Sequence, residues 1–249
     1  MNSRQSDRAS APTYLFMASE VRSGSTYIAE LISYSLKESL NLEVWDLTKE
    51  RLRDFNDYSS PQEVEEAVSS LWLSPQNFRS SKIMCAQLSI MNRCARSDSD
   101  LADLVFGPNA KWIVVRRRNR IRQAVSLAVA RETGVYHSYE QQSAGKRSEV
   151  SVQSIEAALR AVMLSDEYLR LFSAIPAVCA ELFYEDILAD PMSTIGDALR
   201  KMGLLEKADD LKLADAKLIP DRIAEKADLE ARFADWFLEN HHPIPDRSE

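Results

Sequence analysis

The stretch "TYLFMASEVRSGSTYIAELISYSLKE", residues 13–38, decides the fold of this chain. Its first seven residues form an apolar run typical of a buried strand, and a helical pattern starts near Ser25 or Thr26. Between them, "VRSGST" contains the first of only six glycines in the chain. A strand, a small-residue turn and a helix together form a cradle for a phosphate-like anion, because N–H groups at a helix N-terminus point at such a ligand.

Each residue of this turn has a chemical use in anion binding. Gly24 lacks a Cβ and lets the backbone approach an anion closely. Ser23, Ser25 and Thr26 add hydroxyl donors, and Arg22 offers a planar fork of N–H groups. The nucleotide-binding pattern G-x-x-x-x-G-K-[ST] is absent. The turn taken alone is equally compatible with a simple helix cap, in which Ser23 or Ser25 accepts the capping hydrogen bond.

A second positive cluster follows the strongest strand signal, "AKWIVVR" at 110–116. "RRRNRIR", residues 116–122, contains five arginines in seven positions and leads into a helix predicted over 119–132. Arg118, Arg122 and Ser126 are spaced by four residues, which places them on one helix face. The alternative is a solvated basic face. Together with the turn, the cluster predicts a ligand with two separated phosphate-like groups.

The rest of the chain alternates strand and helix signals. Further strands are expected at 82–89 and 177–186, and further helices at 61–73, 101–106, 151–173, 191–204 and 228–241. Such alternation predicts one α/β domain over 13–240, with a parallel sheet flanked by helices, between a flexible tail at 1–12 and a frayed tail at 241–249. Ligands of such sheets bind beyond the carboxyl ends of the strands, where the turn and the arginines both lie.

Composition narrows the function classes. The net charge of −7 and a pI of about 5.2 argue against nucleic-acid binding, so local charge must hold any anion. Three cysteines without a paired framework fit a reducing compartment. No apolar run approaches the roughly 20 residues of a membrane span, and the polar N-terminus lacks a signal-peptide core. We therefore expect a cytoplasmic location, and the three scattered histidines predict no metal site.

Two segments resemble a known family: "YLFMASEVRSGSTYIAELI" and "KWIVVRRRNRIRQAVSLAVARETGVYHS". They are similar to the bacterial sulfotransferases that include trehalose 2-sulfotransferase and NodH-like lipopolysaccharide sulfotransferases. "RSGST" (22–26), "QAVS" (123–126) and "ARETGVYHS" (130–138) match closely, and "KIMCAQ" and "YEDILADP" match more weakly. The resemblance covers residues 13–240. It implies a P-loop-like three-layer fold, 3′-phosphoadenosine-5′-phosphosulfate (PAPS) as donor, 3′-phosphoadenosine-5′-phosphate (PAP) as product, and a homodimer.

The resemblance also assigns roles. Arg22 with Ser23, Gly24, Ser25 and Thr26 would bind the 5′-phosphosulfate. Ser126 with Arg117, or as the weaker alternative Arg118, would bind the 3′-phosphate.

The family's catalytic glutamate, in a "GEPxEFF" segment, falls on Glu43. Of that segment only Glu43 and the aromatic Trp45 are retained, since Ser39, Leu40 and Asn41 replace its glycine, first glutamate and proline. Trp45, Tyr136 and His137 are the expected acceptor contacts.

The expected function is transfer of a sulfuryl group from PAPS to a hydroxyl of a carbohydrate, glycolipid or other small alcohol. Glu43 would act as the base, Arg22 would stabilise the leaving group, and no metal would be needed. One alternative is a catalytically impaired PAPS- or PAP-binding protein, because the segment around Glu43 is altered. The other is an ATP-dependent small-molecule kinase, which the missing P-loop lysine and the lack of an aspartate pair for Mg²⁺ disfavour.

Overall fold

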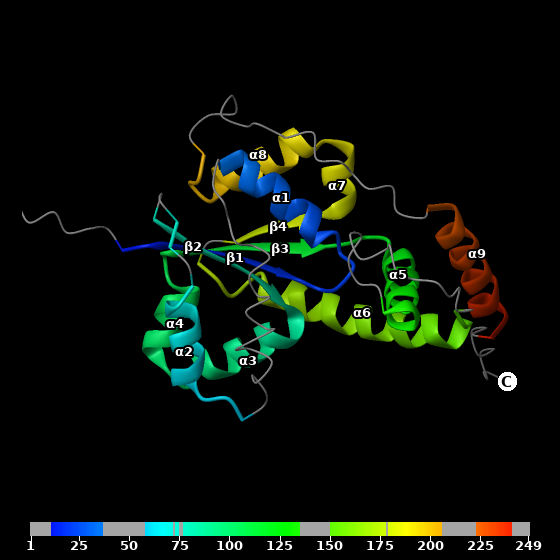
Figure 1. Ribbon diagram of the computed structural model, residues 1–249, viewed down its shortest axis with the longest axis horizontal. Coiled ribbons are helices and arrows are strands. Elements are labelled where there is room, and N and C mark those ends of the chain that lie inside the picture. The colour runs from blue at the N-terminus through cyan, green and yellow to red at the C-terminus, as the bar shows by residue number, and fades with distance from the viewer. Residues whose placement is uncertain are drawn as a thin grey trace, which may run out of the picture.

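Four parallel strands form the central sheet of the molecule, in the order β2-β1-β3-β4 (Figure 1). This computed structural model describes residues 11–36, 58–71, 73–74, 77–134, 150–177, 179–205 and 223–240. The strands are β1 (Thr13–Ser19), β2 (Phe78–Met84), β3 (Ala110–Arg116) and β4 (Cys179–Phe183). Helices cover both faces of this parallel sheet, and this explains why β1 and β3 are apolar almost throughout.

The described helices form a layer on each side of the sheet (Figure 1). One face carries α1 (Ser25–Leu36), α7 (Tyr184–Ala189) and α8 (Pro191–Lys201). The other carries α2 (Pro61–Ser69), α3 (Cys85–Ala95), α4 (Ser99–Phe106) and the long α6 (Val152–Phe172). Two more helices, α5 (Arg120–Thr133) and α9 (Ile223–Asn240), pack with α6 beyond the carboxyl end of β3. The predicted three-layer α/β fold is confirmed.

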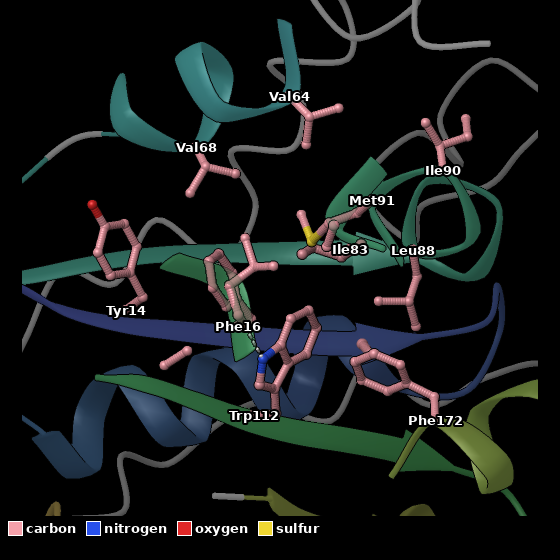
Figure 2. Packing of buried hydrophobic residues seen from close by; sticks show 14 of the residues in the cluster. Tyr14, Phe16, Val64, Val68, Ile83, Leu88, Ile90, Met91, Trp112 and Phe172 are labelled. Atoms are coloured by element: carbon pink, nitrogen blue, oxygen red, sulfur yellow. Dashed lines mark hydrogen bonds between the residues drawn. The ribbon is translucent and has the colours of Figure 1, made fainter. Parts of the chain in front are cut away.

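Alternate residues of the strands fill the two halves of the core. Trp112 is the centre of one half, with its ring centroid 4.8 Å from that of Phe16 and 4.8 Å from that of Phe172 (Figure 2). Its indole N–H donates to the carbonyl of Val105, at 2.7 Å, so the buried polar group is satisfied. On the opposite face, Met17 and Ile113 pack with residues of α1 and α8.

The strand order creates a topological switch point between β1 and β3. From β1 the chain crosses to β2 on one side, and it later returns to β3 on the other side. The connections at the carboxyl ends of β1 and β3 therefore run to opposite sides. α/β sheets bind ligands at such a switch point. The turn at 20–24 and the arginine cluster flank this point.

Most predicted elements are confirmed, including the strands at 13–19 and 110–116 and the helix from Ser25. The strand predicted over 82–89 is wrong beyond Met84, because α3 begins at Cys85. A short apolar run does not distinguish strand from helix by periodicity. The last strand also ends earlier than predicted, at Phe183, and "YED" opens α7.

The predicted tail 241–249 lies outside the described residues, and 1–12 is described only at its last two positions. Among the helices that the structure describes, none is long and apolar enough to cross a membrane.

Candidate active site

The turn between β1 and α1 has an unusual backbone. Arg22 and Gly24 both have positive φ, 61° and 87°, and the N–H of Ser23 donates to the carbonyl of Glu20 at 3.3 Å. The first-turn N–H groups of α1, beginning at Ser25, have no carbonyl within the helix to pair with. The buried Ser23 hydroxyl has no hydrogen-bond partner among the described residues, so it does not cap the helix. The turn thus presents donors to a ligand.

Gly24 is required here for a second reason, its contact with Tyr184 at the start of α7. A Cβ on Gly24 would lie 2.2 Å from Cδ2 of the Tyr184 ring. The ring therefore packs directly against the turn backbone. Tyr184 directly follows β4. Its contact with Gly24 therefore connects the segment after β4 to the segment after β1 at one edge of the sheet.

Arg22 reaches across the switch point to α5. Its Nε donates to Oγ of Ser126 at 2.9 Å, and Nζ of Lys226, on α9, lies 3.3 Å from the same oxygen. Arg22 and Ser126 were assigned to different anions on the basis of the sequence, and the structure brings them into contact. Arg122 pairs with Glu230 of α9, with 3.3 Å between Nε and Oε1. Arg118 was predicted on the same helix face, but α5 begins only at Arg120.

Two side chains that follow β3 hold the turn in place. The Gln123 amide donates to the carbonyl of Val21 at 2.9 Å, and the Arg117 guanidinium donates to the carbonyl of Arg22 at 3.1 Å. A left-handed conformation costs a residue with a side chain about 1–2 kcal/mol. These two hydrogen bonds, together with the one from Arg22 to Ser126, offset that cost at Arg22.

The three consecutive arginines have three different environments. Arg116 is buried and forms a bidentate pair with Asp166 of α6, at 2.8 and 3.0 Å. Arg118 is half-exposed, pairs with Asp186 and lies over the Phe183 ring. Arg117 lies nearest the turn, with its guanidinium carbon 4.9 Å from the centroid of Tyr184. Of the three, Arg117 is therefore best placed to contact a ligand at the switch point.

Asp166 also pairs with Arg120, the first residue of α5, and so ties α5 to α6. Burial alone would raise the pKa of the Asp166 carboxyl, but hydrogen bonds and charge from Arg116 and Arg120 outweigh it and hold this pKa below its ordinary value of 3.8. The ion pair thus fixes the geometry of the segment from which Arg117 projects.

Glu185 binds the backbone of the same segment. Its carboxylate accepts the N–H of Arg118 at 2.9 Å and that of Asn119 at 3.1 Å, and it lies 3.7 Å from Nε of Arg117. Tyr184 therefore contacts the turn after β1, and Glu185 contacts the arginine segment after β3. Together they connect the two loops of the switch point.

A further cation reaches the turn from β2. Nζ of Lys82 lies 3.4 Å from Oγ1 of Thr26, in the first turn of α1. Arg22, Arg117, Lys82 and Lys226 thus gather positive charge at one edge of a chain whose net charge is −7.

The remaining predicted site residues lie outside the described part of the chain. They are Glu43, Trp45, Tyr136 and His137. Within the described ranges, no group of three or more histidine, cysteine, aspartate or glutamate side chains is placed to hold a metal ion.

Comparison with known protein families identifies the family of this chain. The sequence profile of the Stf0 sulphotransferase family matches residues 62–236, well over half of the chain. The chain belongs to this family. The predicted family is confirmed, and with it the reaction class of the enzyme, the transfer of a sulfuryl group. The matched range contains the arginine segment, Tyr184 and Lys226, and it begins after the turn at 22–26.

Solved structures with a similar fold are distant from this sulfotransferase. A sulfotransferase from Alicyclobacillus acidocaldarius is 13% identical, with a TM-score of 0.46 over 91% of this chain and 92% of its own. Mouse sulfotransferase SULT7A1 complexed with PAP is 13% identical, with a TM-score of 0.41 over 95% and 70%. Retinol dehydratase with retinol and PAP is 14% identical, with a TM-score of 0.42 over 94% and 84%. A search of curated protein sequences finds no match.

Sequence reasoning about the sulfotransferase missed several residues at the site. Gln123 carried a detectable signal, because it lies three positions before Ser126 and hence on the same helix face. The segment "YED", which contains Tyr184 and Glu185, was expected at the ligand edge after the last strand, but it was assigned no role. Lys82 and Lys226 carried no local signal, since strand pairing and helix packing bring them to the turn.

Proposed function

We propose that this sulfotransferase uses PAPS as its sulfuryl donor. The 5′-phosphosulfate would bind at the turn formed by Arg22 and Ser23–Thr26, and the 3′-phosphate at Ser126 and Arg117. The observation that supports this most is the 2.9 Å contact between Arg22 and Ser126, which joins the two anion-binding motifs at the switch point. A ligand with two phosphate-like groups matches two adjacent clusters of donors.

The residues at the turn fit a phosphosulfate. The buried Ser23 hydroxyl can donate to an anionic oxygen, and the helix N-terminus favours negative charge. Lys82, at 3.4 Å from Thr26, adds a cation on the β2 side. Removing one such donor from a site of this kind typically costs a few kcal/mol of binding or transition-state stabilisation.

In the proposed reaction the acceptor hydroxyl oxygen attacks sulfur in line, and the bond from sulfur to the 5′-phosphate oxygen breaks. Glu43 would take the hydroxyl proton, a role that contributes about 10²–10⁴-fold to such reactions. Arg22, Lys82 and the N–H groups of the turn would stabilise the charge that develops on the departing phosphate oxygen. PAP is then the second product.

We propose a carbohydrate, glycolipid or other small alcohol as the acceptor, contacted by Trp45, Tyr136 and His137. We also propose that residues 13–240 act as one domain, in a cytoplasmic homodimer. The proposed assembly is tested by light scattering after size-exclusion chromatography, where a monomer mass would contradict it.

Calorimetric titration with PAP and with ATP–Mg²⁺ tests the donor. We expect PAP to bind with micromolar or tighter affinity and ATP–Mg²⁺ to bind far more weakly; the reverse order would contradict PAPS as the donor. Incubation with radiolabelled PAPS and a lipid or sugar extract then tests turnover. Labelled product identifies the acceptor, whereas PAP binding without transfer to any acceptor in the extract would contradict the proposed acceptor class.

A further inference from the structure

The outer face of α6 exposes apolar side chains to solvent, although the inner face of this helix belongs to the core. Val162 and Leu169 are each 1% exposed, whereas Leu164 and Leu171 are 76% and 56% exposed. Of the twelve exposed large hydrophobic side chains among the described residues, four lie within 163–175. Figure 1 shows α6 on the opposite side of the sheet from α1 and α8. A concentration of exposed apolar side chains of this kind marks an interaction surface.

The exposed face of α6 has the heptad spacing of a coiled-coil seam. Ala157, Leu164 and Leu171 recur every seven residues and match the d positions of a heptad. Ala161 and Tyr168, each four residues after a d position, match the a positions. All five side chains are apolar or aromatic, and none of them is classed with the buried residues of the helix. The seam therefore indicates a helical partner.

The charged residues beside the seam indicate which helix fits. Arg160 and Glu167 occupy successive g positions and are exposed, whereas the e positions include the buried residues Ala158 and Phe172. In a parallel pair each g residue faces an e residue of the other helix, and here the core occupies the e side. In an antiparallel pair g faces g, and such contacts set partner choice and orientation. A second α6 running antiparallel about Leu164 therefore brings Arg160 opposite Glu167 of the partner subunit, twice by two-fold symmetry.

The same charges form only surface pairs within one protomer. Arg160 pairs with Glu156, and Arg170 pairs with Glu167, both between neighbouring turns of α6. Exposed pairs of this kind contribute only a few tenths of a kcal/mol, so the side chains can turn to a second helix at little cost. Along the helix the four charges alternate from negative at Glu156 to positive at Arg170. Read in the reverse direction, this row is complementary to itself.

We propose that two copies of this chain associate through antiparallel α6 helices, with Leu164 at the two-fold axis. Arg160 of each protomer then pairs with Glu167 of the partner subunit. This interface rests on the proposed function, because it assigns a surface to the homodimer proposed there. The helix at the interface also carries Asp166, which pairs with Arg116 on its inner side.

Charge reversal tests the pairing between the two helices. R160E places two glutamates opposite each other and E167R places two arginines opposite each other. Like charges in such contacts oppose association, so each single variant should dissociate at least about tenfold more readily than wild type. An equimolar mixture of the two variants should recover the dimer, because each chain then presents the charge that the other lacks. Light scattering after size-exclusion chromatography, over a range of protein concentrations, measures the mass.

The apolar seam is tested at its centre. L164E places a charge at the two-fold axis and should shift the mass to that of a monomer. The matched control is L238E, at a leucine of α9 that is 68% exposed, and it should keep the wild-type mass. Far-UV circular dichroism should show the wild-type helix content in every variant, since all three positions are exposed.

The outcomes separate the interface from the assembly. A monomeric wild type overturns the homodimer itself. A wild-type dimer that L164E and both charge reversals leave intact overturns only the interface on α6. If the single reversals dissociate but their mixture stays monomeric, the pairing of Arg160 with Glu167 is overturned. None of these masses depends on which sulfuryl donor the enzyme uses.

Discussion

Nε of Arg22 lies 2.9 Å from Oγ of Ser126, although 104 positions separate the two residues in the chain. The contact connects the turn after β1 to the helix after β3. The Gln123 and Arg117 hydrogen bonds to the turn carbonyls strengthen the same connection. The two proposed anion-binding motifs are therefore in contact, and a change in one is expected to alter ligand binding at the other.

The first prediction concerns the Ser126 hydroxyl. S126A removes the acceptor for Arg22 and Lys226 and the donor offered to the ligand, so we expect PAP to bind about tenfold or more weakly. Calorimetry measures the change. S89A, at an exposed serine of α3, is the control and should bind PAP as wild type does. Unchanged PAP affinity in S126A would contradict the proposed 3′-phosphate site.

The second prediction concerns the contact of Gly24 with Tyr184. Alanine at Gly24 must adopt a φ near 87° and place its Cβ 2.2 Å from the ring, so strain and overpacking add. We expect G24A to lose about 2–5 kcal/mol of unfolding free energy and to lose PAP binding. G203A is the control, because Gly203 has a similar φ of 70° with nothing near its Cβ position, and it should lose only about 1–2 kcal/mol.

A double variant separates the two causes at Gly24. In G24A/Y184A the ring is gone, so the combined loss should be smaller than the sum of the two single losses. If the losses of unfolding free energy measured by urea denaturation are additive, the ring contact is not a cause of the destabilisation in G24A.

The third prediction distinguishes Arg117 from Arg118. Arg117 lies between the turn carbonyl of Arg22 and the Tyr184 ring, whereas Arg118 is half-exposed and paired with Asp186. We expect R117M to weaken PAP binding by about tenfold or more and R118M to change it by less than about threefold. The variants are matched in size and charge, and a larger effect of R118M would assign the 3′-phosphate to Arg118.

The fourth prediction is a pH dependence carried by Asp166. Its pKa lies below the ordinary 3.8 in the folded protein, so the paired carboxylate stabilises the fold above about pH 4 and this contribution is lost as the pH falls through the folded-state pKa. D166N should lose about 3–5 kcal/mol near neutral pH, because it removes the bidentate partner of buried Arg116 and leaves only the pair with Glu181 at 3.3 Å. The difference from wild type should shrink below about pH 4.

Denaturant unfolding across pH measures this effect. E167Q is the control, since Glu167 is the neighbouring acidic residue of α6 and its pair with Arg170 is exposed on both sides. It should unfold close to wild type at neutral pH. A D166N deficit that stays constant down to about pH 3 would exclude the carboxylate as its cause.

The fifth prediction concerns Glu43 as the proposed base. E43Q retains the size of the side chain but not its proton affinity, so turnover should fall by about 10²–10⁴-fold while PAP affinity is unchanged. Radiolabel transfer and calorimetry measure the two quantities. Turnover within a few-fold of wild type would end the assignment.

The sequence alone determined the order of the main elements and the place of the two predicted anion-binding motifs. Apolar runs at 13–19 and 110–116, each followed by a helical pattern, were sufficient for this, because hydrophobic periodicity and helix signals are local. Local signals also explain the error at 82–89, where a short apolar run continues from a strand into a helix.

Only the tertiary structure decided how the motifs meet. Nothing in the spacing of Arg22, Ser126 and Lys226 predicts that side chains from the turn after β1 and from α9 both contact the Ser126 hydroxyl on α5, since strand order and helix docking set those distances. The same applies to the arginines at 116–118, which are equivalent in sequence. Arg116 pairs with Asp166 and Arg118 pairs with Asp186, whereas Arg117 packs against Tyr184 beside the turn.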